Sequence, residues 1–85
     1  MTGRHQLPTL LGRHMWAKLN QPRNVAKGDN WRGMTMDEMW LNILTEVDEL
    51  RVAIMREGPE AILSEIADVA NFLAMLADKV ESEGS

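Results

Sequence analysis

The fold is decided by residues 35–80, which read TMDEMWLNILTEVDELRVAIMREGPEAILSEIADVANFLAMLADKV. Thr35 is followed three residues later by Glu38, the capping-box arrangement that opens a helix. The apolar residues after it recur at the i, i+3 and i+4 spacing of an amphipathic helix. They are Met39, Trp40, Ile43, Leu44, Val47, Leu50 and Ile54. The pattern predicts a helix over residues 35–57 that stops at Gly58-Pro59.

A second helix is predicted immediately after this stop. Pro59 suits the first turn of a helix, and residues 61–80 contain neither glycine nor proline. The segment is apolar almost all round, so it has to be buried on every side, and we expect other subunits to cover part of it. The short connection between the two helices predicts an antiparallel helical hairpin.

The N-terminal part is predicted to contribute one more helix. Pro8 can open it, and it would run to about Asn20. Residues 21–34 are rich in glycine, proline and asparagine and are predicted to form a loop. Residues 1–6 and 82–85 are expected to be flexible ends of the domain.

These elements predict one all-α domain over residues 1–85. Its fold would be an antiparallel helical hairpin plus an N-terminal helix, assembling into a multi-helix bundle by oligomerisation. Trp16 and Trp40 are expected in the core. A chain of 85 residues has only a marginal core of its own, which also favours assembly.

Composition excludes several function classes. The chain has no cysteine, so disulfides, thiolate zinc sites and cysteine nucleophiles are excluded, and a cytoplasmic location is expected. A net charge of -4 argues against general binding to nucleic acids, which need a basic surface. The most apolar stretch, residues 66–76, is interrupted by Asp68 and Asn71 and is too short to span a bilayer, so no membrane partner is expected.

Two pairs of carboxylates suggest a metal site. Glu46-Val-Asp-Glu49 and Glu65-Ile-Ala-Asp68 each have i, i+3 spacing, so each pair projects from one side of its helix. Both pairs lie roughly 12 to 20 Å from the predicted turn, which puts the four groups at one level of the hairpin. Unpaired carboxylates in one place repel one another, and Mg²⁺ would relieve this because it prefers oxygen ligands.

The positions of the four acids on their helices bear on whether they are surface charges, salt-bridge partners or metal ligands. Glu46, Glu65 and Asp68 project onto or beside the apolar faces of their helices, where an unpaired charge is costly. Glu49 projects furthest from the apolar face of its own helix. A purely structural network of salt bridges remains open. Sites built on histidine fit less well, because His5 and His14 are not in a Glu-x-x-His spacing.

The paired acids resemble the signature of a known family. Glu-x-x-Glu, 15 intervening residues and Glu-x-x-Asp resembles the metal-binding motif of MazG-like proteins, which are all-α nucleoside triphosphate pyrophosphatases. The segment from Asn24 to Arg32 is similar to the Lys-Gly-Asp-Trp segment of small phage- and integron-type members. Asp68-Val-Ala-Asn71-Phe72 is similar to the family's Asp-Val-x-Asn continuation. The resemblance covers residues 16–80, with Ala26 standing where relatives often carry histidine.

The resemblance implies hydrolysis of an NTP or dNTP to the monophosphate and pyrophosphate, as part of nucleotide-pool clean-up. It implies Mg²⁺ ligands at Glu46, Glu49, Glu65 and Asp68, with Mn²⁺ as a substitute ion. Glu46 or Glu49 would serve as the catalytic base. The expected substrate contacts are Lys27, Trp31, Arg32 and Asn71. The expected assembly is a homo-oligomer, either a dimer or a tetramer.

Two alternatives to this function stay open. One is a non-catalytic helical oligomerisation module, in which the acidic pairs form salt bridges. The other is a related pyrophosphatase that acts on phosphoribosyl-ATP.

Overall fold

The computed structural model describes residues 3–22 and 30–84. The elements are the short 3-10 helix η1 (Arg4–Gln6), helix α1 (Leu7–Leu19), the 3-10 helix η2 (Asn30–Gly33), helix α3 (Met36–Arg56) and helix α4 (Pro59–Gly84). The described residues contain no strand, so the predicted all-α class is confirmed. Within the described ranges, no helix combines the length and the apolar character needed to cross a membrane.

Helix α3 begins and ends where the sequence predicts. The Thr35 hydroxyl accepts a hydrogen bond from the Glu38 amide at 3.1 Å, and the Thr35 amide donates to the Glu38 carboxylate at 3.2 Å. This confirms the capping box, which supplies partners for backbone N–H groups that a helix start leaves unpaired. At the other end Glu57 is extended, and Pro59 starts α4 two residues later.

Helix α4 is longer than predicted. The sequence indicates a helix to about residue 80 followed by a polar tail, but α4 continues to Gly84. Lys79 and Glu83 form an ion pair of 2.9 Å at i, i+4 spacing, which supports the last turns. No strong helix breaker occurs before Gly84, so the helix has no local reason to stop earlier.

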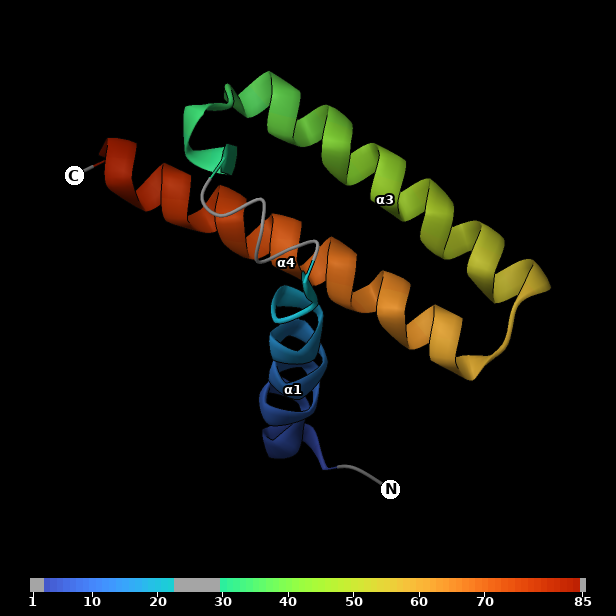
Figure 1. The fold of residues 1–85 in the computed structure, drawn as a ribbon. Coiled ribbons are helices and arrows are strands. Elements are labelled where there is room, and N and C mark those ends of the chain that lie inside the picture. The colour runs from blue at the N-terminus through green and yellow to red at the C-terminus, as the bar shows by residue number, and fades with distance from the viewer. Residues whose placement is uncertain (1–2, 23–29, 85) are drawn as a thin grey trace.

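Helix α4 is the element that both other long helices contact. It lies side by side with α3, which runs in the opposite direction, and α1 packs against α4 at a steep angle (Figure 1). The buried apolar side chains are Met39, Ile43 and Ala53 on α3 and Ala67 on α4. The core therefore consists mainly of one stripe of α3 pressed against α4.

Trp16 and Trp40 correct one expectation. Both were expected in the core, but their side chains are 69% and 53% exposed. The apolar pattern of α3 is wider than the surface that α4 covers, so part of it faces outward. We call Trp40, Leu44, Val47 and Ile54, which share one side of α3 at helical spacing and are all exposed, the outer stripe of α3.

Candidate metal centre

Three carboxyl groups meet where the middle of α3 packs against α4. Glu46 and Glu49 come from successive turns of α3, and Glu65 comes from α4. Each offers one oxygen, and the three oxygens lie within 4.8 Å of one another. We call these residues the carboxylate cluster. Glu49, whose sequence position places it furthest from its apolar stripe, is part of the cluster and is its most exposed member.

The cluster contains buried oxygens that no other described group satisfies. One carboxylate oxygen of Glu46 and one of Glu65 are shielded from solvent, and neither has a hydrogen-bond partner among the described residues. Buried polar atoms are normally paired, because an unpaired one retains its full desolvation cost. Two such atoms in one acidic cluster are acceptors that a cation or a hydrogen-bond donor could satisfy.

The electrostatics of the cluster agree with its geometry. Burial raises the pKa of Glu46 from 4.5 to about 7, assisted by the nearby carboxyl groups of Asp68, Glu49 and Glu65. Burial also raises the pKa of Glu65, and the charges of Asp68 and Glu49 act in the same direction. Lys18 opposes this rise. The fold therefore holds these acids close together without fully compensating their charge.

Asp68 is the predicted ligand with a partner of its own. It lies near Glu46 and Glu65, since it raises the pKa of both, but it is not one of the three residues whose oxygens converge. Its carboxylate forms an ion pair of 3.2 Å with the Lys18 ammonium of α1. The structure thus brings three of the four predicted ligands together and pairs the fourth with a lysine.

Lys18 was not among the residues predicted from the sequence. It is only 7% exposed, and its ammonium also donates a hydrogen bond to the Ser64 hydroxyl at 2.5 Å. The sequence does contain a sign that Lys18 is partly buried. Lys18 lies four residues after His14 and three after Met15, so it shares their side of α1. A lysine among the less exposed positions of a helix needs an acidic partner elsewhere in the fold.

A pocket of about 370 Å³ adjoins the carboxylate cluster. Six residues line it: Thr45, Asp48, Glu49, Val52, Glu57 and Glu65. Four of these carry carboxyl groups, and none of the described lining residues is basic. The negative charge of these four groups favours a ligand that is cationic or that arrives with cations.

The predicted substrate-binding residues are divided between several places. Trp31 and Arg32 belong to η2, and the Arg32 guanidinium lies 4.7 Å from the centre of the Trp31 ring. Glu46 lies ten residues beyond Met36, the first residue of α3, which corresponds to about 15 Å along the helix. Lys27 lies outside the residues that the structure describes.

Asn71 fastens α1 to α4. Its side chain is 6% exposed, and its amide nitrogen donates a hydrogen bond of 3.2 Å to the backbone carbonyl of Met15. Its carbonyl oxygen is buried and has no hydrogen-bond partner among the described residues. The predicted contact with a sugar or base would thus have to use this oxygen, because the amide nitrogen is engaged with α1.

Comparisons of the chain with models of protein families, with curated proteins and with solved structures find no match. The donor set of the cluster itself indicates which ion it would suit. All its donors are carboxylate oxygens, which hard cations such as Mg²⁺ and Mn²⁺ prefer over the nitrogen and sulfur ligands favoured by zinc and copper. The two unpaired oxygens of Glu46 and Glu65 fit such an ion, because it would supply the charge and the bonds that they lack.

Proposed function

We propose that this protein is a cytoplasmic, Mg²⁺-dependent nucleoside triphosphate pyrophosphohydrolase of the MazG-like type. The observation that carries the proposal is the carboxylate cluster with its two buried, unpaired oxygens. The sequence resemblance supplies the reaction class, which is hydrolysis of an NTP or dNTP to the monophosphate and pyrophosphate. When bound, Mg²⁺ (or Mn²⁺) supplies Lewis-acid polarisation of the phosphate oxygens and an acidified water.

The residues of the cluster have distinct parts in this proposal. Glu46 or Glu49 would accept the proton from the attacking water, and Glu46 is the more buried of the two. Glu49 is more exposed and faces the adjoining pocket, where it can bind the ion from the solvent side. Glu65 and Asp68 approach from α4 and would complete an oxygen-only ligand set.

Because the pocket is acidic, the proposed substrate would need metal ions to bind as well as to react. A triphosphate is strongly anionic, and the pocket beside Glu49 and Glu65 is lined by four carboxyl groups. Without cations the two would repel each other. Substrate is therefore expected to bind as its metal complex, and turnover should rise steeply with free Mg²⁺.

The test is an assay of pyrophosphate release from a panel of canonical and damaged nucleoside triphosphates, with Mg²⁺ and with Mn²⁺. We expect metal-dependent turnover of at least one nucleotide, lost by about 100-fold or more in Glu46→Gln, the order that general-base catalysis contributes. Glu81→Gln, which removes an exposed carboxyl near the end of α4, is the matched control and should keep wild-type activity. No turnover of any nucleotide with either ion would overturn the proposal.

A non-catalytic helical module is the second candidate, and the ion pair between Lys18 and Asp68 favours it. This pair is what a structural salt-bridge network would contain. The two candidates differ in their response to metal. An ion that binds only the folded chain raises the melting temperature by mass action, whereas a salt-bridge module should show no specific shift. If pyrophosphate is released, analysis of the products separates NTP substrates from phosphoribosyl-ATP.

Self-association through exposed apolar side chains is part of the proposed function. The outer stripe of α3 leaves four large apolar residues in solvent, and Leu73 and Val80 of α4 are also about half exposed. An extended apolar surface on such a small chain is typical of a protein–protein interface. We propose that a second copy covers it and that the antiparallel hairpin of α3 and α4 is the unit that assembles, into a dimer or a tetramer.

A further inference from the structure

We propose, on the basis of the metal site proposed above, that Lys18 is a built-in cation of that site. In the metal-free protein it holds Asp68, and it has to release Asp68 before a divalent ion can use all four carboxylates. Lys18 would then set the metal concentration at which the site fills.

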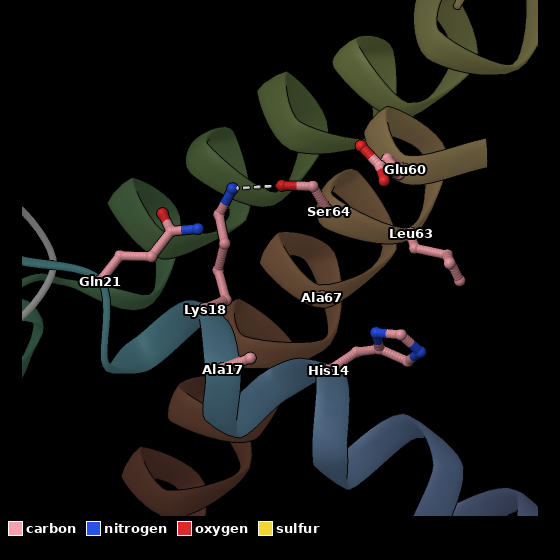
Figure 2. Close-up of a pocket in the computed structure, with 8 residues that line it drawn as sticks. All are labelled: His14, Ala17, Lys18, Gln21, Glu60, Leu63, Ser64 and Ala67. Atoms are coloured by element: carbon pink, nitrogen blue, oxygen red, sulfur yellow. Dashed lines mark hydrogen bonds between the residues drawn. The ribbon is translucent and has the colours of Figure 1, made fainter. Parts of the chain in front are cut away.

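The first observation behind this proposal is the placement of the Lys18 ammonium. Figure 2 shows the side chain reaching from α1 toward Ser64 on α4. Its nitrogen lies 3.2 Å from Asp68 and 2.5 Å from the Ser64 hydroxyl, and the lysine side chain is 9% exposed. With so little solvent around it, this ion pair is screened far less than a surface pair.

The second observation is that Asp68 has two possible cationic partners. It lies one turn after Glu65 on the same helix, and in the same conformation it is paired with Lys18. A divalent ion held by Glu46, Glu49 and Glu65 would attract Asp68 as well. Binding Asp68 to both cations would bring an ammonium close to a doubly charged ion, and like charges at short range repel strongly. The two cations therefore compete for one carboxylate.

The third observation is that Lys18 can release Asp68 without displacing its helix. Ser64 lies one turn before Asp68 on α4 and already accepts a hydrogen bond from the ammonium. Helix α1 is also fastened through the hydrogen bond from Asn71 to the Met15 carbonyl. The flexible lysine stem can then swing away from Asp68 while α1 stays in place.

The test is a titration of the protein with Mn²⁺ alone, followed by the electron paramagnetic resonance signal of the free ion. In Lys18→Met we expect Mn²⁺ to bind roughly tenfold more tightly, because the ion no longer has to break a partly buried ion pair. The metal-free variant should melt at a lower temperature than wild type, since the acids lose their internal cation. The matched control is Lys79→Met, which removes the same charge from an ion pair with Glu83 elsewhere on α4 and should not tighten Mn²⁺ binding.

A double substitution separates competition for Asp68 from general repulsion between Lys18 and the metal. In an Asp68→Asn background, Lys18→Met should no longer tighten Mn²⁺ binding if the competition runs through Asp68. If it tightens binding as much as before, the lysine acts only as a nearby charge and the proposal is wrong. Should Lys18→Met fail to fold without metal, Lys18→Gln keeps a hydrogen-bonding group near Ser64 and should bind Mn²⁺ more tightly in the same way.

The outcomes also separate this proposal from the proposed metal site. If wild type and Lys18→Met bind Mn²⁺ equally, the role of Lys18 is overturned while the metal site stands. If neither wild type nor any Lys18 variant binds Mn²⁺, both are overturned. Weak binding by wild type together with clear binding by Lys18→Met supports both.

Discussion

Glu46 has a strongly raised pKa, and its titration should change the stability of the metal-free protein. Its pKa is about 7 in the folded chain, against an ordinary value of 4.5. Between these two values the folded state binds more protons than the unfolded state, so the free energy of unfolding falls as pH rises through this window. We expect the melting temperature to fall between about pH 5 and pH 7.5 and to level off above it.

The variant Glu46→Gln tests this prediction, because it removes the titrating group and retains the shape. It should flatten the pH dependence and raise the metal-free melting temperature at pH 8 by at least about 4 °C, the shift that 1 kcal/mol produces in a domain of this size. Solvent screens this partly exposed carboxyl, which keeps the gain well below the full equivalent of the pKa shift. The control Glu81→Gln should follow the wild-type curve, and a Glu46→Gln curve with the wild-type slope would contradict the assignment.

Asn71 is the second residue whose contribution can be isolated. Its buried amide donates to the Met15 carbonyl between two helices, so Asn71→Ala removes that bond between α1 and α4 and also opens a small cavity. We expect a loss of about 1 to 3 kcal/mol in the free energy of unfolding, measured by urea titration. Asn42→Ala is the matched control, since its amide bonds to the Glu38 carbonyl within α3, and it should cost less than about 0.5 kcal/mol.

The residues of the candidate site were predictable only as far as local spacing determines them. Glu46 and Glu49 are one turn apart on one helix, so their proximity follows from the period of the helix. The ion pair of Lys18 with Asp68 joins residues fifty positions apart, and it depends on how α1 crosses α4. Periodicity shows that Lys18 shares the packed side of α1 but carries no information about that crossing, so it does not predict the pairing of Lys18 with Asp68.

At the scale of elements, the start of α3 offers a separate prediction. The Thr35 hydroxyl pairs an otherwise unsatisfied backbone N–H, so Thr35→Ala should lower the free energy of unfolding by about 1 kcal/mol. Thr45→Ala is the matched control, because that hydroxyl bonds back to the Leu41 carbonyl in the middle of α3 and contributes little. Thermal melting followed by circular dichroism compares the two. If both variants lose the same free energy of unfolding, the capping box does not stabilise α3 more than the hydrogen bond of Thr45 does.

Helix boundaries were predictable wherever the local chemistry is strong. The capping box at Thr35 and the Gly58-Pro59 dipeptide fix the two ends of α3 through residues adjacent in sequence. The end of α4 was predicted too early, because the polar residues after Val80 gave no stop signal and the pair of Lys79 with Glu83 extends the helix. Local signals therefore define the helices better than they define what covers them.

At the scale of the whole molecule, the exposed apolar surface predicts self-association. The four residues of the outer stripe of α3 are between 43% and 61% exposed. Apolar residues at this helical spacing normally form a buried face. Helix α4 covers only the stripe of α3 that faces it, and the other described helices leave the outer stripe exposed. We therefore expect sedimentation velocity to give a dimer or a tetramer in dilute solution.

A charge placed in the middle of the outer stripe should disrupt this assembly. Leu44→Glu puts a carboxylate where a second copy would have to bury it, which costs several kcal/mol when no partner is supplied. The control is Leu41→Glu, which changes a more exposed leucine about 60° away from Leu44 around α3, outside the stripe. We expect Leu44→Glu to sediment as a smaller species while Leu41→Glu keeps the wild-type mass. If both variants and the wild type sediment as monomers, the wide apolar pattern of α3 has a purpose other than self-association. If Leu41→Glu alone dissociates, the interface lies on the neighbouring face of α3 that carries Leu41, and not on the outer stripe.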